Sequence, residues 1–362
     1  MNEGKRVFIT DCEGPISKND NAFELASHFI PEGERFYTQI SRYDDVLAYV
    51  VKREGYNAGD TLKLIVPFLK AYGATNAKIA KLSAQNIVLM PGIKETLQFV
   101  QEMPSFIVST SYEHYIRALC NVLDFPYSNV YCTCLDIDSH SVSSAELERL
   151  KEFRRQIRRL PLIEFSKNIT SLQDLSETDQ RTIEQLNDVF WEKITNMESG
   201  VFLKEIKPIG GVEKAKAAED IVYRSRTSLR DVIYVGDSIT DVECFRLIRK
   251  NGGVTISFNG NEYAVIEADI AILSNNALPI AVIAQVYGKY GSDSVYDLVN
   301  NWKREKLSRF KVVPALLKAV EQTFPHVLPE VSRVTKSNVE RLAKESSSFR
   351  KRVRGEEVGR LG

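Results

Sequence analysis

The sequence predicts an α/β fold whose core is a doubly wound parallel sheet. Short apolar segments recur along the chain, and most of them are separated by stretches with the 3.6-residue apolar period of helices. Strands that alternate with helices pair in parallel, because parallel neighbours need a long connection between them. The predicted strands are RVFIT (6–10), SFIVS (105–109), NVYCTC (129–134), DVIYVG (231–236), GVTISF (253–258) and DIAIL (269–273).

Two helical segments interrupt this alternation, and a third helical segment follows it. None of the three contains a convincing strand, and the last ends in SFRKRVRGEEVGRLG, which we interpret as a charged, partly frayed terminus. The predicted units are a core of 1–17, 91–137 and 204–290, a helical cap of 18–90, a second helical insertion of 138–203, and a helical C-terminal extension of 291–362.

The composition indicates an ordinary globular protein and excludes several classes of function. Hydrophobic residues make up 43% of the chain, and the 48 Lys and Arg residues balance 48 Asp and Glu residues. A chain without net charge has no overall attraction to nucleic acid or anionic membranes, so neither partner is expected. The five cysteines are an odd number and mostly scattered, which indicates reduced thiols and not a disulfide framework. The first residues also lack a signal-peptide pattern, so we expect a cytoplasmic protein. The oligomeric state does not follow from the sequence.

Acidic residues follow two of the predicted strands. Asp11 and Glu13 come after the first strand, and Asp237 and Asp241 come after the fourth. Because the carboxyl ends of parallel strands meet at one edge of a sheet, we expect these four acids in one crevice. Like charges 4 Å apart repel by roughly 4 kcal/mol at an effective dielectric of 20, so the cluster needs a cation. Carboxylate oxygens are the ligands that a hard divalent cation prefers, so we expect this cation to be Mg²⁺.

Anion-binding groups are predicted at the same edge. The strand SFIVS leads into Ser109, Thr110 and Ser111 just before a helix, where hydroxyls and free amides can bind an anion. If the strand were shifted by one residue in register, Thr110 or Ser111 would take the anion-binding position in place of Ser109. Lys214 begins the helix before the fourth strand and competes with Lys216 for a place between an acid and a phosphate oxygen.

Four segments in order resemble the motifs of the haloacid dehalogenase-like hydrolase superfamily. They are DCEGP (11–15), IVSTS (107–111), Lys214 and GDSITD (236–241). PGIKETLQFV (91–100) is similar to the helix before the second motif in the phosphoserine-phosphatase-like branch, which has a helical cap. The resemblance covers the predicted core, whereas the insertions and the C-terminal part resemble only uncharacterised archaeal members.

The resemblance implies a Mg²⁺-dependent phosphatase that hydrolyses a small phosphorylated metabolite through an aspartyl-phosphate. It implies catalytic roles for Asp11 as the nucleophile, for Glu13 as the acid and base, and for Lys214. The implied phosphate-binding residues are Ser109, Thr110 and Lys214, and the implied metal-binding residues are Asp11, Glu13, Asp237 and Asp241. Asp20 is implied to bind the substrate.

The first motif departs from the family pattern. Glu13 replaces an aspartate and is one methylene longer, and Pro15 replaces a threonine and lacks its hydroxyl and backbone donor. This departure leaves two alternatives open. One is a protein that binds phosphate or metal without turnover, and the other is a phosphotransferase or mutase on the same site.

Overall fold

The computed structural model describes residues 5–164, 169–310 and 312–361. Residues 1–4 of the predicted core, 165–168 of the predicted second insertion, and 311 and 362 of the predicted extension lie outside this range. A seven-stranded sheet has the order β3-β2-β1-β4-β5-β6-β7, in which β1 to β6 are parallel and β7 is antiparallel to β6. This arrangement confirms the predicted fold class. The strands are β1 Val7–Thr10, β2 Ser105–Tyr112, β3 Val130–Thr133, β4 Val232–Gly236, β5 Val254–Phe258, β6 Ile270–Leu273 and β7 Glu330–Arg333.

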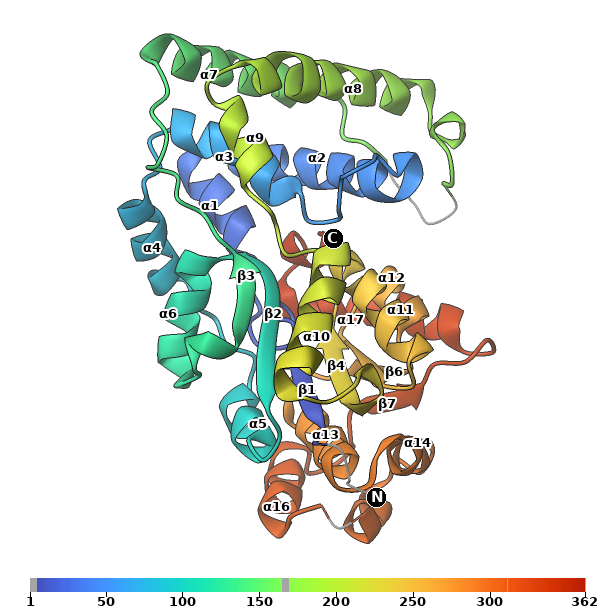
Figure 1. Ribbon diagram of the computed structural model, residues 1–362. Helices are drawn as coiled ribbons and strands as arrows, with labels where there is room; N and C mark the ends of the chain where they lie inside the picture. Colours follow the sequence, from blue (N-terminus) through green and yellow to red (C-terminus); the bar gives the residue numbers. More distant parts are fainter. Residues whose placement is uncertain (1–4, 165–168, 311, 362) are drawn as a thin grey trace.

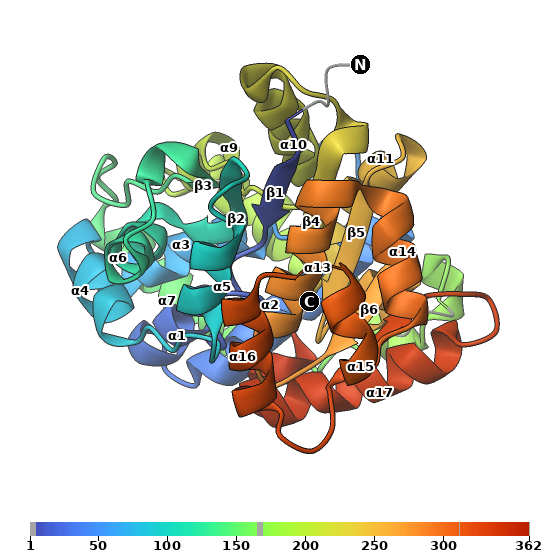
Figure 2. The ribbon, with the colours of Figure 1, turned by 90° about the horizontal axis from the view of Figure 1, so that it is seen from below.

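Helices cover both faces of the sheet (Figures 1 and 2). In β4, Ile233 and Val235 face one apolar cluster, and Val232 and Tyr234 face the other, as the two-residue period of a strand requires. The first cluster includes α5 Ile93–Val100, α6 Glu113–Leu123, α13 Leu278–Tyr290, α14 Ser292–Asn300, α15 Arg304–Leu307 and α16 Pro314–Thr323. The second includes α10 Val212–Ser225, α11 Val242–Lys250 and α12 Glu262–Glu267.

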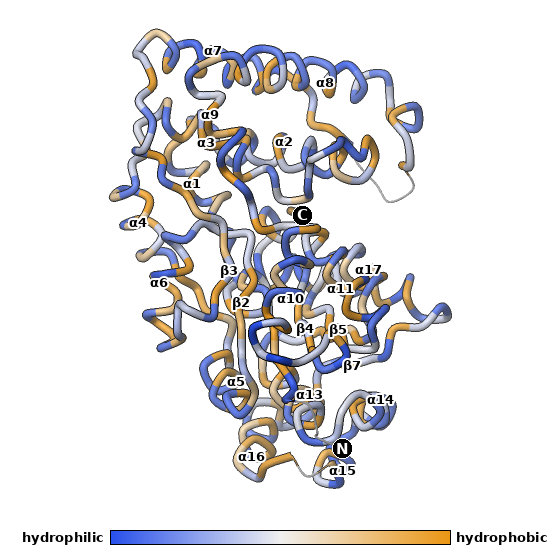
Figure 3. Tube along the Cα trace, viewed as in Figure 1, coloured by the Kyte–Doolittle hydropathy of each residue, from blue (hydrophilic) through white to orange (hydrophobic). Residues whose placement is uncertain are grey.

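The two helical insertions share one hydrophobic core and form a single helical domain above the sheet (Figure 1). Tyr43 from the first insertion stacks on Phe190 from the second, with ring centroids 5.8 Å apart. Hydrophilic residues dominate α7 and α8, the outermost helices of this domain (Figure 3). Its helices are α1 Asn21–Phe29, α2 Gly33–Asp45, η1 Val46–Val51, α3 Thr61–Ala71, α4 Asn76–Gln85, α7 Ser144–Arg159, α8 Glu177–Asn187, η4 Asp188–Lys193 and α9 Gly200–Glu205.

The C-terminal extension differs from its prediction in two ways. It contains β7, which adds an antiparallel edge strand to the sheet, so it is not wholly helical. Its charged end is not frayed, because α17 Val339–Arg354 packs on the core and buries Leu342, Ser346 and Arg350. The chain then runs back so that the C-terminus lies between the helical domain and the sheet (Figure 1).

None of the described helices is long and apolar enough to cross a membrane. Short 3-10 turns connect many of the elements. The 3-10 turns are η2 Tyr127–Asn129, η3 Leu172–Asp174, η5 Ile194–Asn196, η6 Leu229–Asp231, η7 Ile239–Asp241, η8 Ser308–Phe310 and η9 Val358–Arg360.

Candidate active site

A buried lysine joins three of the four sequence motifs. Lys214 lies in the first turn of α10, and its side chain is wholly inaccessible to solvent. Its Nζ donates to Asp11 Oδ2 and to Asp241 Oδ1, at 2.7 Å in each case. The first acid follows β1 and the second follows β4, which pair directly in the sheet. The parallel topology therefore brings Lys214 into contact with Asp11, which is 203 positions earlier in the sequence.

Asp241 is saturated with hydrogen bonds. Besides Lys214, the Tyr234 hydroxyl donates to its Oδ1 at 2.7 Å. The backbone amides of Asp237 and Ser238 donate to its Oδ2 at 2.9 and 3.0 Å. A carboxylate offers about four lone-pair positions, so these four donors leave none for an ion. This side chain orients Lys214, and the geometry does not favour the predicted metal-binding role for Asp241.

Asp237 lies against the turn of the first motif. Gly14 has a φ of +102°, and a Cβ atom at this position would be 2.0 Å from Asp237 Oδ2. Only glycine therefore fits here, which explains this part of DCEGP. Asp237 Oδ2 also accepts hydrogen bonds from two arginines of α17, from Arg350 Nη1 and, at 3.0 Å, from Arg354 Nη1.

Arg350 and Arg354 are residues that sequence reasoning missed. Both side chains are at most 4% exposed, and both line the cavity above Asp11. A signal was available in the sequence, because Leu342, Ser346, Arg350 and Arg354 are spaced by four residues and so share one face of a helix. Arginines that continue the apolar stripe of a helix point toward the protein interior.

Glu13 is partly exposed and lines the same cavity. Its Oε1 accepts hydrogen bonds from the Asn21 amide at 2.9 Å and from the Ser111 hydroxyl at 2.5 Å. Loss of water around the carboxyl group and the nearby charge of Asp20 raise the pKa of Glu13 to about 8. Burial also raises the pKa of Asp11 to about 7, against the lowering effect of Lys214.

The structure resolves which serine or threonine of the second motif reaches the cavity. Thr110 lines it, and its hydroxyl donates to the Ile209 carbonyl at 3.1 Å. The Ser109 side chain points to the opposite face of β2, where its hydroxyl accepts from the Ser111 amide at 3.2 Å. Of the two predicted phosphate-binding residues, the geometry favours Thr110.

Asp20, the predicted reader of the substrate, lines the cavity as the N-cap of α1. Its carboxylate accepts from the Phe23 amide at 2.9 Å, and the Tyr37 hydroxyl donates to it at 3.5 Å. Burial raises the pKa of Asp20. The capping bond accounts for this acid without a ligand, and the structure leaves its predicted role a prediction.

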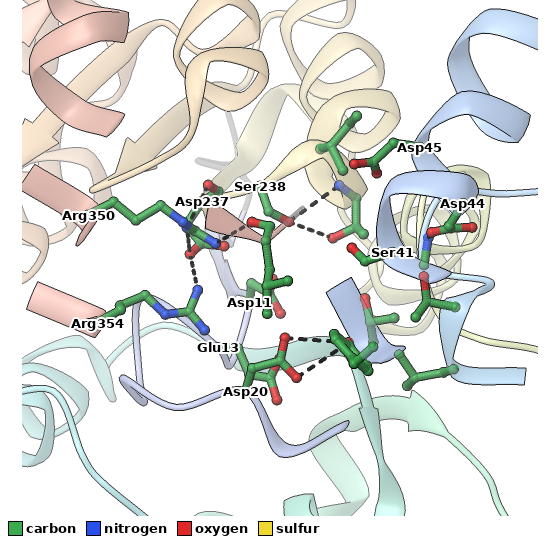
Figure 4. A pocket seen from close by; sticks show the side chains of 18 residues that line it. Asp11, Glu13, Asp20, Ser41, Asp44, Asp45, Asp237, Ser238, Arg350 and Arg354 are labelled. Carbon is green, nitrogen blue, oxygen red and sulfur yellow. Dashed lines mark hydrogen bonds and ion pairs between the residues drawn. The ribbon is translucent and has the colours of Figure 1, made fainter. Parts of the chain in front are cut away.

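The cavity has two walls, which Figure 4 shows facing one another. The core wall includes Asp11, Glu13, Asp237, Arg350 and Arg354, and the cap wall includes Ser41, Asp44 and Asp45 from α2.

The carboxylates of the cap wall have no ion pair with another described residue. Asp44 Oδ2 accepts from the Gly59 amide at 2.8 Å. Its buried Oδ1 receives no hydrogen bond of good geometry from the described residues, although the Tyr56 and Thr61 side chains lie near enough to the carboxyl group to lower its pKa. Burial, followed by the charge of Asp60, raises the pKa of Asp44 to about 7. The Asp45 carboxyl is also buried, which raises its pKa well above the ordinary value.

The donor set fits a hard divalent cation. Asp11, Asp237 and Asp241 each offer a carboxylate oxygen within 4.8 Å of the others. Since Asp241 is saturated, Asp11 and Asp237 are the side chains that would hold Mg²⁺, which in proteins binds one or two carboxylates together with water and phosphate oxygens. Asp237 Oδ1 carries no hydrogen bond from the described residues, so an oxygen remains for an ion.

Comparisons with solved structures extend over the whole chain. Gene product AF1437 from Archaeoglobus fulgidus matches with a TM-score of 0.80 and 28% identity, covering 99% of this chain and 99% of that chain. This match includes the sheet, the helical domain and the C-terminal extension. No protein-family model matches the sequence, and no curated protein is similar to it.

Phosphoserine phosphatases are also among the similar structures. A phospho-aspartyl intermediate analogue has a TM-score of 0.47 and 14% identity over 77% of this chain and 98% of that chain. A substrate-bound complex has a TM-score of 0.45 and 15% identity over 77% of this chain and 98% of that chain.

Proposed function

We propose that this protein is a haloacid dehalogenase-like, Mg²⁺-dependent phosphatase that hydrolyses a small phosphomonoester through an aspartyl-phosphate on Asp11. The observation that carries this proposal is the contact of Lys214 Nζ with Asp11 and Asp241, at 2.7 Å in each case. It joins a nucleophile, a cation and an orienting acid from three separate motifs at one edge of the sheet. Such a unit is suited to phosphoryl transfer, which depends on positioning and charge stabilisation.

The first step forms the covalent intermediate. A carboxylate oxygen of Asp11 attacks phosphorus, and the bond between phosphorus and the ester oxygen breaks. Glu13 gives its proton to the leaving oxygen, so the product is a neutral alcohol. The raised pKa of Glu13, about 8, supports this role because the side chain then holds its proton at neutral pH.

The second step regenerates the enzyme. The ionised Glu13 takes a proton from a water molecule, whose oxygen attacks phosphorus and displaces the Asp11 carboxylate as inorganic phosphate leaves. Throughout, Lys214 stabilises negative charge beside Asp11. Mg²⁺ held by Asp11 and Asp237 would neutralise charge on the transferring group.

The nucleophile is tested by Asp11→Asn in the full chain. With p-nitrophenyl phosphate and Mg²⁺ we expect turnover to disappear, while the exposed control Asp293→Asn keeps the parent rate. Circular dichroism checks that both variants are folded. An Asp11→Asn enzyme with the parent rate would show that Asp11 is not the nucleophile.

The same assay with a panel of phosphorylated metabolites separates the alternatives. Free phosphate accumulates from a phosphatase, whereas a mutase moves the phosphoryl group without releasing it. Release from none of the panel, with or without Mg²⁺, favours a protein that binds without turnover. The cytoplasmic location predicted from the sequence stays a prediction.

A further inference from the structure

The charge of the cavity poses a problem for an anionic substrate. Six carboxyl groups line it, from Asp11, Glu13, Asp20, Asp44, Asp45 and Asp237. Lys214 lies behind Asp11, and its Nζ already contacts two carboxylates. Among the described residues of the lining, only Arg350 and Arg354 carry positive charge. A phosphate dianion that enters this cavity meets its favourable protein charges on α17.

Both guanidinium groups keep unused donors. A guanidinium has five N–H donors. Arg354 uses three of them, to Asp237 Oδ2 at 3.0 Å, to the Lys18 carbonyl at 2.8 Å and to the Asn19 carbonyl at 3.0 Å. Arg350 donates from Nη1 to the carbonyl and Oδ2 of Asp237, and from Nη2 to the Leu361 carbonyl at 3.4 Å.

The buried Nε of Arg350 donates to no partner among the described residues, so part of its hydrogen-bonding capacity is unused. Both arginine side chains line the cavity, so an acceptor bound there can take up N–H groups that the described residues leave unused. In Figure 4 both arginines extend from α17 toward Asp237 and the space above Asp11 and Glu13.

We infer that Arg350 and Arg354 bind the oxyanion of the substrate's phosphoryl group, so that the C-terminal helix α17 forms part of the phosphate-binding site. The planar fork of arginine matches two phosphate oxygens at once. The inference deepens the proposed function and rests on it for the identity of the anion. The inference also makes the C-terminal extension, which contains α17, part of the substrate-binding site.

A purely structural role is the competing explanation. Arg354 links Asp237 to the loop at Lys18 and Asn19, and such a clamp needs no ligand. The two roles differ in what happens when the partner acid is removed together with the arginine. A residue that only neutralises Asp237 becomes dispensable once Asp237 is neutral, whereas a residue that binds phosphate does not.

The experiment measures the affinity of the full chain for inorganic phosphate by calorimetry, without added Mg²⁺. Arg350→Gln and Arg354→Gln are each expected to weaken binding by about tenfold, as expected for lost hydrogen bonds to a charged group. Arg352→Gln, which removes an exposed charge from the same helix, is expected to change affinity by less than about twofold. The double variant Arg354→Gln with Asp237→Asn is expected to stay as weak as Arg354→Gln.

Parent-like affinity in the two single Gln variants, or restored affinity in the double variant, would overturn the inference. If a Gln variant does not fold, Arg350→Lys and Arg354→Lys keep the charge but lose the fork, and parent-like affinity in both would overturn it equally. Turnover is measured separately with p-nitrophenyl phosphate. A parent that binds phosphate through the arginines but does not hydrolyse the ester contradicts the proposed phosphatase alone.

Discussion

The two walls of the cavity treat their carboxylates differently. On the core wall, Asp11 pairs with Lys214, and Asp237 pairs with Arg350 and Arg354. On the cap wall, Asp44 and Asp45 have no ion pair with any residue that the structure describes, and burial raises the pKa of both. Two acids of the core wall are therefore paired with cations, whereas Glu13 on the core wall and both acids of the cap wall have a pKa raised by burial and no ion pair with a described residue.

This difference indicates a division of labour. Paired charges on rigid strand ends fix the position of a nucleophile and of an ion, which the chemistry requires. The carboxyl groups of Asp44 and Asp45 on α2 line the cavity and have no ion pair with a described residue. Under the proposed function, we expect the core wall to carry the reaction and the cap wall to face the rest of the substrate.

Removing the positive charge of Lys214, which pairs with Asp11, tests this difference most strongly. Lys214→Met leaves two buried carboxylates without their shared partner, which we expect to lower the free energy of unfolding by about 3–5 kcal/mol. Turnover should fall by at least roughly a hundredfold, because the charge beside the transferring group is lost. Urea unfolding and initial rates measure the two effects.

The matched control is Lys216→Met on the same helix. Lys216 is 61% exposed and pairs only with Glu213 among the described residues, so both quantities should stay near the parent values. Equal losses in the two variants would contradict the assignment of Lys214.

The pH profile tests the proton held by Glu13. The proposed reaction needs Asp11 ionised and Glu13 protonated, so kcat/KM should fall as the pH rises through about 8, and fall again below about 7. A bound cation lowers the pKa of Asp11, which moves the acidic limb to lower pH.

Glu13→Gln cannot donate a proton, and we expect its rate with phenyl phosphate, a poor leaving group, to fall by about 10²–10⁴-fold. The basic limb should disappear from the residual activity. Glu24→Gln serves as the control, because burial also raises the pKa of Glu24 to about 7 although it does not line the cavity. A Glu13→Gln enzyme that keeps the basic limb would exclude Glu13 as the acid.

The smallest expected effect concerns the cap wall. Because the pKa of Asp44 is raised to about 7 in the folded protein, ionisation costs stability that is absent near pH 4 and grows as the pH rises to 7. Asp44→Asn cannot ionise, so it should exceed the parent in unfolding free energy by roughly 1–3 kcal/mol at pH 8 and by little at pH 4.

Urea unfolding of Asp44→Asn at both pH values measures the difference, with the exposed Asp293→Asn as control. The cap wall would not differ from the core wall in the stated way if the stability change of Asp44→Asn were the same at pH 4 and pH 8.

The sequence predicted the sheet and the meeting of Asp11, Lys214 and Asp241 because the signals are local. An apolar strand, a turn and a helix follow one another within a few residues. Parallel pairing then puts the carboxyl ends of β1 and β4 at the same edge of the sheet. That these two strands are neighbours was implied by the family resemblance and not by the residues themselves. The choice between Ser109 and Thr110 was left open, because a shift of one residue reverses which side chain faces the cavity.

By itself, then, the sequence determined the α/β core, its six parallel strands and the acids and lysine at their carboxyl ends. Only the tertiary structure decided that the two insertions share one core, that β7 completes the sheet, and that α17 brings Arg350 and Arg354 to Asp237. These contacts join residues far apart in the sequence, such as Leu273 of β6 and Glu330 of β7, or Arg350 and Asp237 at a separation of 113. Long-range packing of amphipathic surfaces selects them, and no local period in the chain specifies which surfaces meet.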